Sequence, residues 1–160
     1  MTSKIIIPFF SLLTLFVISC NDIEHQSDTK ANSNNVFANV IYDKVVAYSY
    51  DGEGDIEIID EKGKLANKIK KQVELSKAQT IKLTNTLCNK STYGGDIAAC
   101  FDPHLGVVFY KTNKPVAHIS ICLDCNYLVS SIKILGEGGF SYDGLKKIMD
   151  FEKELKFWPE

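Results

Sequence analysis

The chain contains no arginine, so all 18 of its basic residues are lysine. Proteins that bind nucleic acid rely on the planar guanidinium of arginine, which forms paired hydrogen bonds to phosphate, and on a clustered basic surface. The formal net charge is −2, and the sequence shows no basic cluster of this kind. We therefore do not expect nucleic acid among the partners.

The sequence also lacks the short motifs of several enzyme classes. It has no Gly-x-Ser-x-Gly turn, no glycine-rich phosphate loop and no His-Glu-x-x-His pair. The acidic stretch that begins at Asp51 resembles a calcium loop, but Ile56 occupies the position of the invariant glycine and Lys62 that of the bidentate glutamate. We expect a hairpin turn there. No cofactor and no complete catalytic set is indicated.

Long hydrophobic runs are absent except at the start of the chain. Lys4 precedes an apolar run over residues 5–18, which ends at Ser19-Cys20. A positive start, a short apolar core and a small residue before the cut are the parts of an export signal, and this core is too short for a confident membrane span. We interpret residues 1–19 as a signal peptide.

The end of this signal, Val17-Ile18-Ser19-Cys20, resembles the lipobox of bacterial lipoproteins. The resemblance implies that Cys20 carries acyl chains such as palmitate and becomes the first mature residue; the alternative is an ordinary cleaved signal with an incidental cysteine. Residues 20–35 are polar and bury too little surface to order, so we expect a flexible linker. The prediction is a domain anchored to the lipid bilayer of the cell envelope, at the outer membrane.

Residues 36–160 carry the hydrophobic patterns of a single domain, and their number suits one core. Runs of β-branched and aromatic residues between glycine and aspartate turns predict strands. The expected strands are 40–50 with a bend at 43–44, 55–59 paired back on it, an exposed edge strand over 69–75, a hairpin of 105–110 and 116–123, and 127–134. A helix over 65–73 is the alternative to the edge strand.

Two helices are expected. The first begins at Ser76, whose segment with Gln79 matches a capping box, and runs to about Cys88. The second has Ser141 as its N-cap. Its core-facing residues should be Leu145, Ile148, Met149 and Leu155, and its water-facing residues Lys146, Lys147, Glu152 and Lys156. The pattern predicts an α+β fold, an antiparallel sheet of about five to six strands with two helices packed on one face.

Four cysteines remain besides Cys20, namely Cys88, Cys100, Cys122 and Cys125. An even number of thiols in an oxidising compartment predicts disulfide bonds. Four cysteines allow three connectivities, and the sequence does not choose among them. One of the three joins Cys88 to Cys100 and Cys122 to Cys125, which closes two small rings.

The spacing of Cys122 and Cys125 also suits a metal ion or a dithiol that cycles between oxidation states. Strand alternation places His118 on the same face as Cys122, and Cys100 and His104 precede the partner strand of the hairpin. If these side chains converge, they form a tetrahedral zinc site. The candidate ligands are Cys100, His104, Cys122 and Cys125, with His118 nearby. The alternative for both histidines is a structural side chain bonded to nearby backbone.

A redox site of the thioredoxin type places its dithiol at the N-terminus of a helix, which lowers the pKa of the attacking thiol. Here a strand is expected directly after Asn126, which argues against that type. Haem attachment requires histidine directly after the second cysteine, and Asn126 occupies that position.

Residues 99–126 contain a Cys-x-x-Pro-His stretch, a hairpin and then Cys-x-x-Cys-Asn. This segment resembles a group of uncharacterised bacterial lipoproteins, common in Bacteroidota. The resemblance implies an envelope location and a shared fold, but no activity. It also implies that Cys100, His104, Cys122 and Cys125 form one site, as a bridge or a metal centre, and it leaves Cys88 outside the pattern.

Two functional hypotheses follow from these observations. The anchor and the absence of a catalytic set favour a non-catalytic binding or accessory domain, whose partner is an envelope protein. The alternative is a metal-binding or thiol-redox protein that uses the cysteine and histidine cluster. Two disulfides without metal would favour the first hypothesis, and zinc bound beside reactive thiols would favour the second.

Overall fold

The computed structural model describes residues 35–136 and 138–157, so the predicted signal peptide and Cys20 lie outside the described residues, as does all of the predicted linker except Asn35. In chain order, the helices and strands are the short 3₁₀ helix η1 (Val36–Asn39), β1 (Lys44–Tyr50), β2 (Ile69–Glu74), α1 (Lys77–Leu87), the 3₁₀ helix η2 (Lys90–Thr92), β3 (Tyr93–Gly95), β4 (Leu105–Lys111), β5 (Lys114–Cys122), β6 (Tyr127–Ser130), β7 (Gly139–Phe140) and α2 (Tyr142–Glu154).

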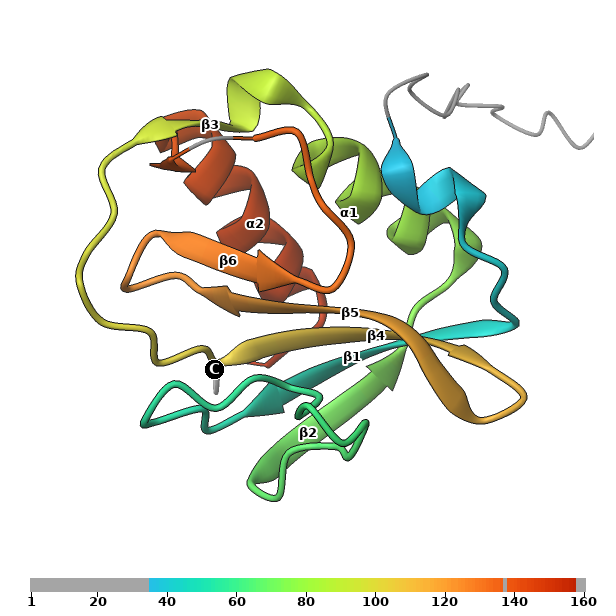
Figure 1. Ribbon diagram of the computed structural model, residues 1–160. Coiled ribbons are helices and arrows are strands. Elements are labelled where there is room, and N and C mark those ends of the chain that lie inside the picture. The colour runs from blue at the N-terminus through green and yellow to red at the C-terminus, as the bar shows by residue number, and fades with distance from the viewer. Residues whose placement is uncertain (1–34, 137, 158–160) are drawn as a thin grey trace, which may run out of the picture.

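The centre of the fold is a five-stranded antiparallel sheet with the strand order β2-β1-β4-β5-β6. Helices α1 and α2 contact each other and lie on one face of this sheet, and β3 and β7 form a small second sheet (Figure 1). This architecture confirms the predicted α+β class. No helix in the described part of the chain has the length and apolar character needed to cross a bilayer.

Strand alternation produces the helix-side core. Every second residue of the central strands points to the helices, where it meets the buried faces of α1 and α2. Fully buried members of this core from the strands include Ala47, Leu105, Val107, Phe109, Ile119 and Ile121, and those from the helices include Leu83, Leu87 and Ile148. The ring of Phe37 in η1 stacks on Phe109, with centroids 5.2 Å apart, and closes one end of the core.

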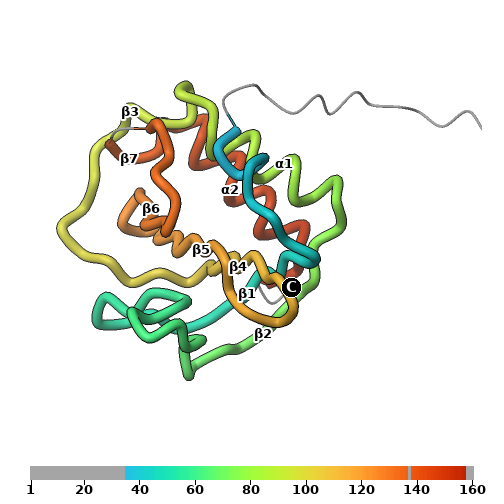
Figure 2. The backbone as a smooth tube through the Cα atoms, turned by 45° about the vertical axis from the view of Figure 1, so that its right-hand side comes forward, coloured from blue at the N-terminus to red at the C-terminus, as the bar shows by residue number. Residues whose placement is uncertain are grey.

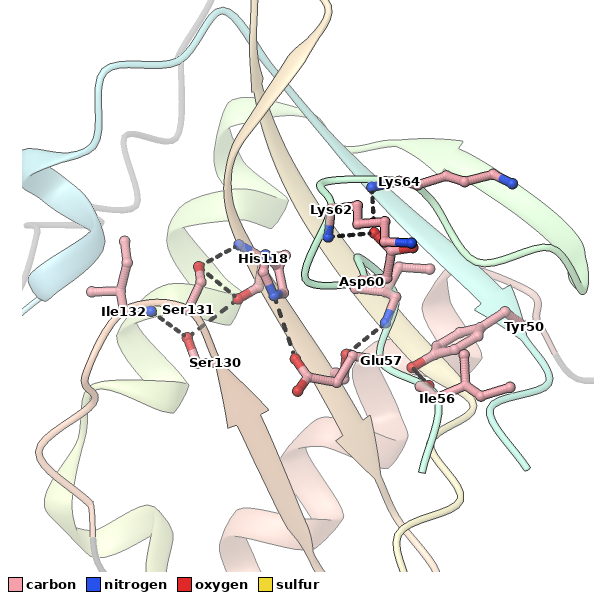
Figure 3. Close-up of polar contacts among 12 residues, drawn as sticks. Tyr50, Ile56, Glu57, Asp60, Lys62, Lys64, His118, Ser130, Ser131 and Ile132 are labelled. Carbon is pink, nitrogen blue, oxygen red and sulfur yellow. Dashed lines mark hydrogen bonds and ion pairs between the residues drawn. The ribbon is translucent and has the colours of Figure 1, made fainter. Parts of the chain in front are cut away.

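The opposite face of the sheet is covered by residues 51–68, which we call the covering loop (Figure 2). The backbone N–H of Ile58 donates a hydrogen bond to Ser120 Oγ at 2.9 Å. The Glu57 carboxylate lies 3.4 Å from His118 Nε2, and the Tyr50 hydroxyl donates to the Ile56 carbonyl (Figure 3). These contacts from β1 and β5 hold the loop against the sheet.

The predicted strand over residues 55–59 is therefore wrong. Only Ile59 makes a bridge, and its partner is Leu65 within the same loop. Both edges of β1 are already paired, with β2 and with β4, so the segment packs its apolar side chains across the face of the sheet instead of extending it. After Ile59 the chain turns at Asp60, whose carboxylate accepts hydrogen bonds from the N–H groups of Lys62 and Lys64 (Figure 3).

Helices and strands that are marked by capping or turn residues formed where the sequence predicted them. The capping box of α1 is present in both directions between Ser76 and Gln79. The β4–β5 hairpin turns at Thr112 and Asn113, whose φ angles of 49° and 63° match the two-residue turns favoured by strand twist. The edge strand β2 also formed, in preference to the alternative helix. The first strand begins only at Lys44, so residues 40–43 of the predicted strand lie between η1 and β1 and belong to neither.

The buried face of α2 differs from the predicted one. Met149 is 40% exposed, and Glu152, which we expected in water, is 2% exposed. The buried face contains Gly144, Ile148 and Phe151. At Gly144 the helix lies so close to the backbone of Thr92 in η2 that any side chain there would collide with it. Close approach of η2 at this glycine orients the helix, and no pattern within the helix itself reveals that contact.

Candidate functional site: three sulfurs at the end of the sheet

Two cysteines meet at the turn between β5 and β6. Cys122 is the last residue of β5, and the chain reverses over residues 123–126, where Asn126 adopts a φ of 62° and donates its N–H to the Leu123 carbonyl. This reversal brings the Cα atoms of Cys122 and Cys125 to 5.2 Å, and the structure joins the two residues by a disulfide. Both are buried, with exposed fractions of 0% and 1%.

A third sulfur lies against this disulfide. Cys100 is exposed, and its Sγ lies 3.0 Å from Sγ of Cys125. Two backbone donors also point at the bridge: the N–H of Asp102 toward Cys125 Sγ at 3.4 Å, and the N–H of Cys125 toward Cys122 Sγ at 3.1 Å. We call Cys100, Cys122 and Cys125 the three-sulfur site.

The loop that carries Cys100 is fixed on both sides of the cysteine. Before it, the N–H of Ala98 donates to the Cys125 carbonyl at 3.0 Å. After it, the Asp102 carboxylate accepts from the N–H of Gly54 in the covering loop, and the N–H of His104 donates to the Ile121 carbonyl. Figure 1 shows the loop running along the outside of the β5–β6 turn. The contact between Cys100 and the disulfide is therefore supported by the surrounding backbone.

Aromatic side chains cover the rest of the site. Phe101 is buried beside the disulfide and packs against Tyr127, with ring centroids 4.9 Å apart. Burial raises the pKa of Tyr127, and the nearby Asp55 and Cys100 raise it further. The disulfide thus lies in a largely apolar environment and is shielded from solvent, whereas Cys100 beside it is exposed.

Cys88 is separated from this site by the sheet. It caps the C-terminus of α1 and belongs to the helix-side core, where its thiol contacts Asn35 Oδ1 at 3.6 Å. Burial raises the pKa of the Cys88 thiol. Cys88 and Cys100 are both free thiols, so the pairing between them that the sequence allowed is not formed.

The two histidines do not join the sulfurs. His104 directs Nδ1 toward the Tyr50 carbonyl at 3.4 Å, and His118 contacts Glu57. His118 does share a face with Cys122, but it lies four positions before Cys122 along the strand, a distance of roughly 13 Å. Among residues 35–136 and 138–157, no group of three or more histidine, cysteine or acidic side chains is arranged to hold a metal ion.

A cavity of about 380 Å³ opens near His104, at the end of the sheet beneath the C-terminal part of α2. It is lined by Ser49, Tyr50, Lys70, His104, Asp124, Glu152 and Phe157. We did not predict Glu152 as a lining residue, because lysines and acidic residues surround it in the sequence. One signal could have found it, since Glu152 follows the core residue Ile148 by four positions, the spacing of one helix face.

No protein-family model, no curated protein and no solved structure matches this chain. The site is therefore interpreted from its own geometry. A free thiol next to a disulfide is the arrangement needed for thiol–disulfide exchange, in which a thiolate attacks one sulfur of the bridge and the other sulfur leaves.

Proposed function

We propose that this protein is a lipid-anchored domain of the bacterial cell envelope that exchanges thiols and disulfides with a partner at Cys100. The observation that carries the proposal is the 3.0 Å contact between the exposed Cys100 sulfur and Cys125, which is bonded to Cys122. This function is the thiol-redox part of the second hypothesis drawn from the sequence. The role as a binding or accessory domain stays a prediction, because no contact among the described residues identifies a partner for it.

The number of sulfurs at the site supports an exchange function. A site with three cysteines can form only one internal disulfide, so its oxidised form always keeps one free thiol. Cys88 cannot complete a second pair, because it is buried in the helix-side core. An exposed leftover thiol in an oxidising compartment is available to form a mixed disulfide with another molecule.

The net reaction is a two-electron transfer. With a dithiol partner as the reductant, the two thiols of the partner become a disulfide and the Cys122–Cys125 disulfide becomes two thiols; the two protons of the partner pass to the site. A disulfide partner drives the reverse reaction. The site differs from a thioredoxin-type dithiol, because β6 and not a helix follows the second cysteine.

The envelope location rests on the N-terminal sequence. A basic start, a short apolar core and the lipobox-like end at Cys20 favour export and acylation, and several acyl chains on one cysteine hold a protein firmly at a bilayer. Export would place the cysteines in a compartment where disulfides persist, which the exchange function requires.

Equilibration of the mature full chain with glutathione buffers tests this function. Besides Cys20, the oxidised chain has two free thiols, Cys88 and Cys100. We expect four free thiols at the reducing end, a midpoint within the range that the buffers cover, and circular dichroism that shows a folded chain throughout. Acid quenching, alkylation and mass spectrometry give the count.

The control is Cys88→Ser, which should keep the same midpoint because Cys88 is remote from the bridge. Cys125→Ser should abolish the transition of the bridge and leave only the glutathione adduct at Cys100. A bridge that resists every buffer while the chain stays folded, together with the absence of a glutathione adduct at Cys100, would overturn the proposal.

A further inference from the structure

We propose that Cys100 is a shuttle thiol that transfers the buried Cys122–Cys125 disulfide to the protein surface. This inference rests on the proposed exchange function and assigns a role to each sulfur. It starts from a difference in exposure: the two bridged cysteines are 0% and 1% exposed, whereas Cys100 is exposed and touches the bridge. A partner thiol cannot reach the bridge directly, but it can reach Cys100.

The contacts indicate which sulfur is attacked and which one leaves. Cys125 is the sulfur in contact with Cys100, so it is the point of attack. Cys122 is then the leaving group, and its Sγ already accepts a hydrogen bond from the N–H of Cys125 at 3.1 Å. A donor at this position stabilises the negative charge that develops on the departing sulfur.

The internal step conserves both atoms and electrons. Cys100 loses its proton, its sulfur bonds to Cys125, the Cys122–Cys125 bond breaks, and Cys122 takes up a proton. One disulfide and one thiol are present before and after, so the step needs no external oxidant. The new Cys100–Cys125 disulfide includes the exposed sulfur of Cys100.

The external steps then follow from ordinary exchange chemistry. A thiolate of a dithiol partner attacks the Cys100 sulfur, and Cys125 leaves as a thiolate and takes up a proton. The second thiol of the partner attacks the sulfur of its own mixed disulfide, which closes the partner's disulfide and releases Cys100. Three thiols now occupy the site, and the partner has been oxidised by two electrons.

The two oxidised forms differ in the thiol that they leave free. Before the internal step the free thiol is Cys100, which is exposed; after it, the free thiol is Cys122, which is fully buried. The shuttle therefore also determines whether the site presents a reactive thiol or a surface disulfide. Residues 96–99, directly before Cys100, are exposed as well, so the approach to this sulfur is open.

The rate of reduction by dithiothreitol, used as the dithiol probe, tests the shuttle. The full chain is prepared as wild type, Cys100→Ser and the control Cys88→Ser, each with the Cys122–Cys125 bridge intact. Samples are quenched in acid, alkylated and mapped by mass spectrometry. We expect reduction of the bridge to slow at least tenfold in Cys100→Ser and to stay unchanged in Cys88→Ser. Serine is no larger than cysteine, so steric blocking would not explain a slower reaction.

The internal step has its own readout in Cys122→Ser, which should form a Cys100–Cys125 disulfide on oxidation. Equal reduction rates in wild type and Cys100→Ser would overturn the shuttle and leave the exchange function standing. A bridge that is not reduced in any folded variant would overturn both. If Cys122→Ser folds but leaves Cys100 and Cys125 as thiols, the internal step is wrong; if it does not fold, the Cys100→Ser rates decide.

Discussion

Cys88 and Cys100 differ in reactivity because they differ in burial. Cys88 and Cys100 are both free thiols, but burial raises the pKa of Cys88, so its thiol stays protonated and unreactive near neutral pH. Cys100 is exposed and lies beside a disulfide. The sequence distinguishes them only by the motif around Cys100, whereas the tertiary structure separates a core residue from a reactive one.

Buried tyrosines should make the free energy of unfolding depend on pH in the alkaline range. The hydroxyls of Tyr48 and Tyr110 share a hydrogen bond of 2.7 Å, and burial, followed by this bond, raises the pKa of Tyr110. An unfolded tyrosine loses its proton near pH 10. The folded chain therefore binds more protons than the unfolded chain above about pH 10, and the free energy of unfolding should fall as the pH rises.

Urea unfolding between about pH 8 and pH 11 measures this dependence. Tyr110→Phe removes one of the responsible groups, so its free energy of unfolding should fall less steeply with pH than that of the wild type. Tyr142 is 83% exposed, and Tyr142→Phe serves as the control that keeps the wild-type slope. Identical slopes in Tyr110→Phe and wild type would contradict the assignment.

At the scale of elements, the covering loop was the feature that sequence patterns misassigned. Its run of isoleucines predicts a strand, but the loop lies across the face of the sheet, where Ile58 packs over Gly106 of β4. The hairpin and both helices were predictable because capping residues and turn residues act within a few positions. The covering loop depends on contacts with Gly106 and Ser120, which lie about 50 and 60 positions further along the chain.

Gly106→Ala tests how closely the covering loop packs against the sheet. An added Cβ would lie 2.7 Å from Cβ of Ile58, so the loop must move away from the sheet. We expect a loss of about 1–3 kcal/mol in the free energy of unfolding, the range typical of overpacking. Ile58→Ala alone should cost about 2–5 kcal/mol. In the double variant the clash is gone, so its loss should be smaller than the sum of the two. Additive losses in urea unfolding would show that the two side chains do not meet.

At the scale of the whole molecule, the sheet separates two chemically different sides. One side holds the helices, the main core and the unreactive Cys88. The other side holds the covering loop, and the three-sulfur site lies at the end of the sheet next to it. The three sulfurs come from two loop segments and one strand end, so only the assembled sheet brings them together.

The proposed anchor also concerns the whole molecule. If Cys20 is acylated, native protein should be found in the membrane fraction, and mass spectrometry should show a chain that begins at Cys20 and carries acyl chains. Cys20→Ser should move the protein out of that fraction while its three-sulfur site still exchanges with glutathione. An unmodified chain that begins at Met1 and stays in the cytosol would overturn both the anchor and the oxidising location.

The sequence by itself determined the α+β class, the β4–β5 hairpin and the starts of both helices, because hydrophobic alternation and capping are local properties of a few neighbouring residues. It also placed His118 and Cys122 correctly on one face. Only the tertiary structure decided the course of the covering loop, the burial of Glu152 and the partner of Cys122. Each of these depends on contacts between segments that are brought together by the fold, and no local pattern records how close such segments come. The contact between Cys100 and Cys125, on which the proposed chemistry depends, belongs to this second group.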